Sequence, residues 1–366
     1  MKIHKERFEI LDGLRGFAAL YVVIHHARLV CWESYYTGYL KHPYLYNPFD
    51  KACLYFFTFF KYGAEAVTLF FVLSGLVIHY KQSHSIQEQL AGFKFNLARY
   101  LQNRIRRIFP PLLFSILLMI LLATISYFLF QQPYPDCLSI KTLLANVAFI
   151  TTPFFSVAGN NFPLWSLRVE WWIYMVYPLL LLINRKKIYL GYLLVLAASI
   201  ILYYLNFNRQ YFWIETFLYL PTWCIGAYIA DVLSDRIKWF KLFNILLVFL
   251  PISLFLQGQY NNYISDFIFG IGLMPVFIFL LSESNSYCKR LVNKLIGYFR
   301  WVSPFSYTLY IIHFPIQSFI TSVYQRYHPQ QLPHSFYLAF IGILASVLVA
   351  YISHFYTEKK FLIRRS

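Results

Sequence analysis

The sequence predicts an all-α polytopic integral membrane protein with about ten transmembrane helices and both termini in the cytoplasm. Hydrophobic residues make up 59% of the 366 residues and charged residues 13%, whereas a typical soluble domain carries about 25% charged residues. Apolar segments of about 20 residues, the length that crosses a bilayer as a helix, recur along the chain. They cover residues 9–30, 63–80, 107–130, 162–183, 187–205, 211–231, 239–256, 262–282, 297–322 and 334–356.

The basic residues fall unequally on the two sides of this topology. With the N-terminus inside, 22 of the 32 Lys and Arg residues lie in inner segments and 6 in outer segments, while the other four lie within spans. Short loops rich in Lys and Arg stay on the cytoplasmic side of a membrane. The net charge of +17 therefore reports topology, and we expect membrane lipids and no nucleic acid as partners.

The connections between the spans are too short for a soluble domain; the longest are 31–62, 81–106 and 131–161. The inner connection predicts a basic amphipathic helix that leads into the third span, with a new helix beginning at Pro110–Pro111, since proline is tolerated in a first turn. The apolar run Thr142–Phe154 is too short to cross a bilayer and predicts an interfacial or re-entrant helix. We expect one transmembrane domain over 1–366, with no fused extracytoplasmic domain.

The stretch "RGFAALYVVIHHARL" of the first span begins with an arginine and has two adjacent histidines near its far end. Arg15 and His26 are eleven residues apart, so they project from one helix face and are separated by about 16 Å along its axis, while His25 points about 100° away. Arg15 alone is compatible with an interfacial anchor, and a single histidine with a hydrogen-bonded core residue. Their shared face favours a polar cleft with a charged entrance, because ionisable groups within spans are functional candidates.

The fourth span contains "SLRVEWWIYMVYP", with Glu170 about 12 Å from its outer end. His26 lies about 6 Å from the outer end of the first span, so the two side chains are expected in the same half of the bilayer and able to meet. Arg168 is expected either to pair with Glu170 or to face the outer surface.

Three other stretches carry polar groups. Arg104 and Arg107 are near one another on a helix face, where they form either a cytoplasmic anchor or a clamp for phosphate groups, which arginine binds in a bidentate manner. The stretch "FFVLSG", which includes Ser74, predicts a close helix contact. In "YTLYIIHFPI", His313 lies in the outer half of the ninth span and is followed by a kinking Pro315.

These stretches occur together in an order that resembles the membrane acyltransferase-3 family of bacterial acyl-CoA-dependent O-acyltransferases, over about residues 8–356. The family's Arg-x10-His, Arg-x-x-Arg and Ser-Leu-x-x-Glu motifs fall on Arg15 and His26, on Arg104 and Arg107, and on Ser166, Leu167 and Glu170. One departure concerns the Gly-Val-Asp that many members have before Phe-Phe-x-Leu-Ser-Gly. Here Ala66-Val67-Thr68 stands in its place, with Glu65 slightly earlier, so the role of that aspartate is expected to be either absent or transferred to Glu65.

The resemblance implies an enzyme of the bacterial inner membrane that moves an acyl group, expected to be acetyl, from cytosolic acyl-CoA to a hydroxyl of a surface polysaccharide or its lipid-linked precursor. Acetyl-CoA is then a co-substrate, and no metal is expected. An acyltransferase with a small-molecule or lipid acceptor is the alternative within this class. A membrane transporter is the alternative from another class, disfavoured because no internal repeat is evident.

The resemblance also implies roles for the motif residues. His26 acts as general base or as a nucleophile that forms an acyl-imidazole, and Glu170 orients or stabilises its ring. Arg104 and Arg107 hold CoA phosphates, while Arg15 either contacts CoA or stabilises the thioester oxyanion. Supporting roles are expected for His25, Ser166, Ser74, His313 and Arg168, and the adjacent His25 is the alternative to His26 as the imidazole used.

Overall fold

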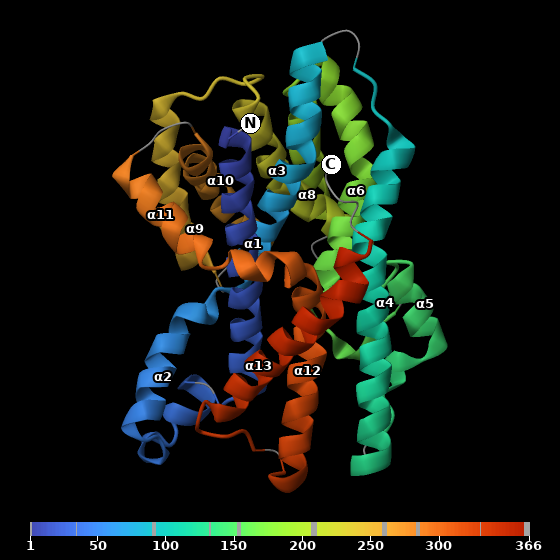
Figure 1. The fold of residues 1–366 in the computed structure, drawn as a ribbon, viewed down its shortest axis with the longest axis vertical. Helices are drawn as coiled ribbons and strands as arrows, with labels where there is room; N and C mark the ends of the chain where they lie inside the picture. Colours follow the sequence, from blue (N-terminus) through green and yellow to red (C-terminus); the bar gives the residue numbers. More distant parts are fainter. Residues whose placement is uncertain are drawn as a thin grey trace. The chain divides into compact units, whose positions relative to one another are not determined.

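The computed structural model describes residues 2–33, 35–89, 93–131, 133–151, 155–205, 211–257, 262–282, 286–329 and 331–361. Its regular elements within these residues are helices, and no β-strand occurs among them (Figure 1). The long ones are α1 (Lys2–Val30), α3 (Gly63–Gln89), α4 (Leu97–Phe130), α6 (Leu164–Lys186), α7 (Leu190–Leu205), α8 (Phe212–Leu233), α10 (Asn262–Leu281), α12 (Ser306–Tyr327) and α13 (Tyr337–His354).

Shorter helices fill the connections. The short α-helices are α2 (Pro48–Thr58), α5 (Ile140–Val147), α9 (Phe249–Leu256) and α11 (Tyr287–Gly297). The short helices of 3-10 or π type are η1 (Tyr35–Tyr39), η2 (Pro43–Leu45), η3 (Phe59–Lys61), η4 (Asp136–Leu138), η5 (Ala158–Asn160), η6 (Lys241–Val248), η7 (Arg300–Phe305) and η8 (Phe355–Lys359). Every predicted apolar segment is thus helical, but the ninth begins as η7 and continues as α12, and the seventh is divided between η6 and α9.

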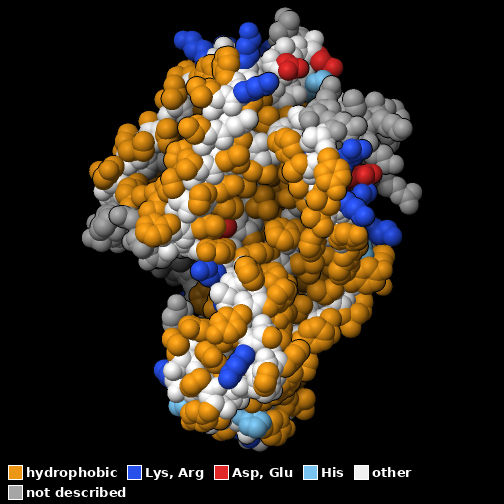
Figure 2. Space-filling view, turned by 90° about the vertical axis from the view of Figure 1, so that its left-hand side faces the viewer, with side chains coloured by type: hydrophobic (Ala, Val, Ile, Leu, Met, Phe, Trp, Pro, Cys, Tyr) orange, Lys and Arg blue, Asp and Glu red, His pale blue; other side chains and the backbone are white. Residues whose placement is uncertain are grey.

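Six helical stretches within the described residues are long and apolar enough to cross a membrane. They are Pro48–Glu88, Leu97–Phe130, Leu164–Lys186, Trp213–Leu233, Tyr263–Leu281 and Tyr337–Lys359. Hydrophobic side chains cover much of the face in Figure 2, and α13 exposes more than half of Phe340, Leu344 and Leu348 at four-residue intervals. The chain is a multi-pass membrane protein; ten spans and cytoplasmic termini stay predictions.

The chain forms two compact units. Unit 1 comprises Met1–Ala18, Ala64–Leu101 and Ser166–Trp301, and unit 2 comprises Ala19–Gly63, Gln102–Trp165 and Val302–Ser366. Helices α1 and α4 contribute residues to both units.

Helix α4 contains both of its adjacent prolines in its interior. It runs without a break from Leu97 through Pro110 and Pro111, so the prediction that a new helix begins at this pair is wrong. An interior proline costs a helix about 3 kcal/mol because it removes a donor and crowds the preceding turn. Ile108 and Leu112, on either side of the pair, are fully buried, and their packing offsets this cost.

Helix α6 shows how the structure accommodates an internal proline. Because proline has no N–H, the carbonyl four residues before it loses its helical donor, and in a membrane that carbonyl needs another partner. Pro178 frees the carbonyl of Tyr174, which accepts a hydrogen bond of 3.1 Å from the hydroxyl of Tyr100. A side chain from α4 therefore replaces the missing bond.

The same arrangement recurs between α7 and α8. Pro221 of α8 frees the carbonyl of Phe217, and the Ser199 hydroxyl of α7 lies 2.6 Å from that oxygen. Each of these two contacts lies within unit 1 and joins a proline-containing helix to a particular neighbour.

Helices α3 and α8 cross at two glycines in unit 1. A Cβ on Gly75 would lie 2.1 Å from the carbonyl oxygen of Trp223, and a Cβ on Gly226 would lie 2.0 Å from that of Val72. Only glycine allows the two backbones to approach this closely. The close contact predicted for "FFVLSG" is therefore confirmed.

The connection at 131–161 is less helical than its apolar composition suggests. Helix α5 begins two residues before the predicted run, at Ile140, and ends at Val147, with Ser139 accepting a bond from the Thr142 amide at its start. Residues 152–154 of the run lie outside the described residues. Ile140 and Leu144 are exposed on one face of α5, which is compatible with an interfacial helix. The interfacial position itself stays a prediction.

Candidate active site

A polar stripe on α12 faces the C-terminal part of α1 within unit 2. It consists of His313, Gln317 and Thr321, which share one helix face because they are four residues apart. The Gln317 amide donates to the Val23 carbonyl at 3.0 Å, and the Thr321 hydroxyl donates to the Val30 carbonyl at 3.1 Å. The stripe therefore fixes how α12 lies against α1. Only His313 was identified from the sequence; the four-residue polar spacing was the available signal for the other two.

His26 and His313 form a hydrogen-bonded pair, which we call the histidine pair. His313 Nε2 lies 3.0 Å from His26 Nδ1, and the ring centroids are 5.0 Å apart. His313 is fully buried, and its Nδ1 lies 3.1 Å from the carbonyl oxygen of Leu309. A carbonyl only accepts, so the hydrogen of a neutral His313 belongs on Nδ1, and Nε2 presents its lone pair to His26.

The same logic assigns the tautomer of His26. Its Nδ1 faces two acceptors, His313 Nε2 and the carbonyl oxygen of Val22 at 3.1 Å. Nδ1 must therefore carry the hydrogen, which leaves the lone pair on Nε2. Within the described residues of unit 2, no hydrogen-bond partner occupies Nε2. This nitrogen can thus act as a base or as a nucleophile.

The neighbouring His25 is held differently. Its Nδ1 donates to the carbonyl of Phe60 at 2.8 Å, in the turn that follows α2. Its ring lies against Gly63, where a Cβ would come within 2.4 Å of the His25 ring carbon Cδ2. His25 therefore ties α1 to the 59–63 segment, whereas His26 is the histidine that has an imidazole partner.

Aromatic rings enclose one side of His26. The ring of Phe314 lies edge-on to His26 with centroids 5.4 Å apart, and Phe162 lies edge-on to Phe314 at 5.5 Å. Such T-shaped contacts restrict ring movement and add apolar surroundings.

Glu170 lies in a hydrogen-bonded cluster in unit 1, which we call the carboxylate cluster. The Ser74 hydroxyl donates to Glu170 Oε1 at 3.1 Å, and the Tyr174 hydroxyl bonds the same oxygen. Trp223 Nε1 donates to the Ser74 hydroxyl at 3.2 Å, a contact made possible by the glycine crossing beside both residues. Tyr174, one helical turn after Glu170, and Trp223 were not identified from the sequence.

Arg168 forms a buried ion pair with Glu215 of α8. The pairing expected with Glu170 is wrong, because residues two apart on a helix do not face each other. The outward-facing alternative is also wrong, since Arg168 is only 3% exposed. Ser166, two residues earlier, is buried in unit 1 as well.

Glu170 belongs to unit 1 and His26 to unit 2, and the contact between them stays a prediction. Arg15 lies on the same helix as His26 but in unit 1, where its Nη1 donates to Asp12 Oδ1 at 3.2 Å. Asp12 is a partner that the sequence interpretation missed, although it precedes Arg15 by one helical turn.

Arg104 and Arg107 lie on α4 before its proline pair. The Arg107 guanidinium lies 5.8 Å from the centre of the Tyr307 ring, a cation–π contact within unit 2. This contact helps to position the guanidinium.

Glu65 occupies the acidic position nearest the family's Gly-Val-Asp element. Its Oε2 accepts a bond of 3.0 Å from Gln257 Nε2, and both Glu65 and Thr68 are buried in unit 1. The structure gives Glu65 a fixed partner, while any exchange of roles with the family's aspartate stays a prediction.

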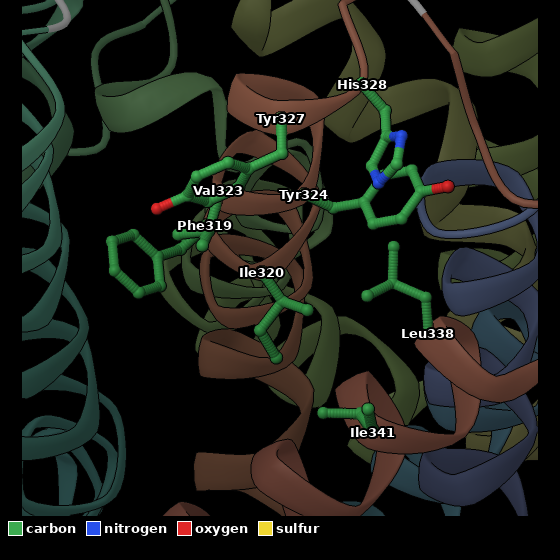
Figure 3. Close-up of a pocket in the computed structure, with 8 residues that line it drawn as sticks. All are labelled: Phe319, Ile320, Val323, Tyr324, Tyr327, His328, Leu338 and Ile341. Atoms are coloured by element: carbon green, nitrogen blue, oxygen red, sulfur yellow. The ribbon is translucent and has the colours of Figure 1, made fainter.

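A groove of about 460 Å³ lies between α12 and α13, apart from the histidine pair (Figure 3). Its walls are apolar, and the stacked rings of Tyr324 and His328, 4.4 Å apart, stand at one end. Neither member of the histidine pair lines it, and its apolar lining suits lipid better than sugar. We therefore place the candidate site at the histidine pair.

Comparison with known proteins identifies the family. A model of the acyltransferase-3 family, described as an acyltransferase domain, matches residues 8–355. This chain belongs to the acyltransferase-3 family. The expected enzyme class, an acyltransferase, is that of the matched domain.

Relatives within the acyltransferase-3 family carry a more specific name. The chain is 25% identical over 380 residues to proteins named O-acetyltransferase OatA from Staphylococcus aureus strains NCTC 8325, COL and MRSA252. These alignments cover 95% of this chain and 56% of each relative, so the chain spans about half the length of the relatives it matches. No solved structure matches the chain.

Proposed function

We propose that this protein transfers an acetyl group from cytosolic acetyl-CoA to a hydroxyl of a surface polysaccharide or its lipid-linked precursor in the bacterial inner membrane. The observation that carries this proposal is the histidine pair, which fixes the His26 tautomer so that Nε2 has a lone pair. The relatives' name, O-acetyltransferase, supports acetyl as the transferred group.

The donor would be held by the basic start of α4. CoA carries anionic phosphates, and Arg104 and Arg107 lie one helical turn apart at that start. Arginine suits phosphate because its planar fork of donors can bind two oxygens. The pantetheine arm would then extend along α1 from the Arg15 region toward His26, a span of about 16 Å on a helix.

The reaction would proceed by general base catalysis at His26. As the acceptor hydroxyl attacks the thioester carbonyl, Nε2 takes its proton and the ring becomes an imidazolium. The C–S bond then breaks, and the departing CoA thiolate recovers that proton, which yields the ester and CoA–SH. His313 Nε2 accepts the Nδ1–H bond throughout and stabilises the imidazolium, a role that a carboxylate fills in serine-protease triads.

Nucleophilic catalysis is the alternative at the same atom. Nε2 would attack the thioester, release CoA and hold the acetyl group as an acyl-imidazole until the acceptor hydroxyl arrives. A radiolabelled acetyl group retained on the protein in the absence of acceptor would favour this route.

The test is CoA release from acetyl-CoA by purified protein, comparing His26→Asn with His25→Asn. Asparagine keeps an N–H at the Nδ1 position but has no basic nitrogen, so the two variants differ chiefly in which imidazole is lost. We expect His26→Asn to lose at least about 100-fold in rate and His25→Asn to retain most of it. Full activity in folded His26→Asn would refute the proposal.

A further inference from the structure

Pro315 lies two residues after His313 and breaks the hydrogen-bond ladder of α12 beside the histidine pair. It removes the donor for the carbonyl of Ile311, one turn earlier. That carbonyl accepts a hydrogen bond of 2.8 Å from Asn161 Nδ2, and the Ser115 hydroxyl lies 3.3 Å from it. Only Nδ2 of the amide can donate to a carbonyl, so the orientation of Asn161 is fixed by chemistry.

This replacement bond is completely enclosed. Asn161 and Ser115 are both 0% exposed, and Asn161 Nδ2 also lies 3.3 Å from the Ser115 hydroxyl oxygen. Asn161 lies in the turn at 158–161, where its backbone N–H donates to the Ala158 carbonyl at 3.0 Å. Water cannot readily replace a lost donor in such a place, because a buried unpaired carbonyl is costly.

Asn161 is also adjacent to the aromatic wall of the site. Its neighbour Phe162 contacts Phe314, and Phe314 contacts His26. The segment that supplies the replacement bond therefore touches the helix of His313 on both sides of His313, at Ile311 and at Phe314.

We propose that Asn161, assisted by Ser115, is a positioning residue that holds the kink of α12 so that His313 Nε2 meets His26 Nδ1. The inference rests on the proposed function for its kinetic consequence, but the geometry it concerns is independent of the substrate. Asn161 acts only through His313.

The test is a mutant cycle between Asn161→Ala and Pro315→Ala. Asn161→Ala removes the donor, so we expect kcat to fall about 10-fold, with little change in the KM for acetyl-CoA, since a small misplacement of a catalytic group is costly. Pro315→Ala restores an N–H to the helix, which can satisfy the Ile311 carbonyl. In that background, Asn161→Ala should lower the rate less than about 2-fold further.

The matched control is Ser199→Ala in unit 1. It removes the equivalent replacement bond at the Phe217 carbonyl, so it tests whether losing such a bond is enough to reduce kcat. We expect a lower melting temperature with unchanged kcat. A Ser199→Ala variant that loses as much kcat as Asn161→Ala would overturn the inference, as would an Asn161→Ala loss of equal size in both backgrounds.

A second readout keeps this test separate from the proposed function. The ¹⁵N spectrum of histidine-labelled protein distinguishes protonated from unprotonated ring nitrogens, and the pair should change its signals in Asn161→Ala but not in Ser199→Ala. If the wild type consumes no acetyl-CoA, the proposed function fails, and the spectra alone decide the role of Asn161. Unchanged histidine signals in folded Asn161→Ala would overturn that role.

Discussion

Replacing His313 by phenylalanine isolates the contribution of the second imidazole. Phenylalanine keeps a buried ring of similar size, but it removes the acceptor 3.0 Å from His26 Nδ1. The Val22 carbonyl, at 3.1 Å, remains to hold the tautomer of His26. The variant therefore tests the orientation and charge stabilisation of His26 while its tautomer stays the same.

The magnitude follows from the charge state of His26 in the transition state. A hydrogen bond to a charged group contributes about 1.5–3 kcal/mol, and each 1.4 kcal/mol corresponds to about tenfold in rate. We expect His313→Phe to lower kcat about 10–100-fold. The KM for acetyl-CoA should change little, because the lost interaction strengthens only as His26 becomes an imidazolium.

The assay is CoA thiol release by detergent-purified protein, followed with a thiol-reactive dye over a range of acetyl-CoA concentrations. His313→Gln is the matched variant, because its side-chain oxygen can accept from His26 Nδ1 and should restore part of kcat. Gel-filtration and thermal-denaturation profiles control for folding. A folded His313→Phe variant with wild-type kcat, or a Gln variant no better than Phe, would refute the role of the pair.

Three further outcomes are expected. Gly75→Ala would place a methyl group 2.1 Å from the Trp223 carbonyl oxygen, so overpacking should lower the stability by about 1–3 kcal/mol; an unchanged melting temperature would contradict the crossing. Arg168→Met should destabilise by about 3–5 kcal/mol because Glu215 loses its buried partner, and adding Glu215→Gln should restore part of this loss in thermal denaturation. Arg107→Gln should raise the KM for acetyl-CoA about 10-fold with kcat preserved, if the guanidinium binds phosphate; a fall in kcat alone would point elsewhere.

The sequence allowed the helices of this protein to be predicted because the apolar segments are long and well separated. Their ends were harder to predict, since a boundary depends on contacts that composition does not contain. Pro110 and Pro111 favour a helix start by local preference, but α4 continues through them. Helices α2 and α11 were missed because neither is long or apolar enough to resemble a span.

Individual residues of the candidate site could be predicted from the sequence, but the contacts between them could not. His26 and His313 could each be identified as unusual groups in a span, but 287 positions separate them in the chain, and no local pattern pairs them. No sequence pattern identified Asn161, because it lies in a turn and its role depends on which carbonyl its side chain meets in the folded protein. Neither position expected for Arg168 included its partner Glu215, because Glu215 comes from another helix.

The prolines of α6, α8 and α12 have a consequence for how the helices assemble after insertion. Each leaves one carbonyl without its helical donor, and each such carbonyl accepts a hydrogen bond from a side chain on a different segment. In lipid, where apolar surfaces hardly distinguish one neighbour from another, a helix that docks against the wrong partner leaves that oxygen unsatisfied. A proline that weakens its own helix thus favours one particular neighbouring segment during folding, because that segment supplies the missing donor.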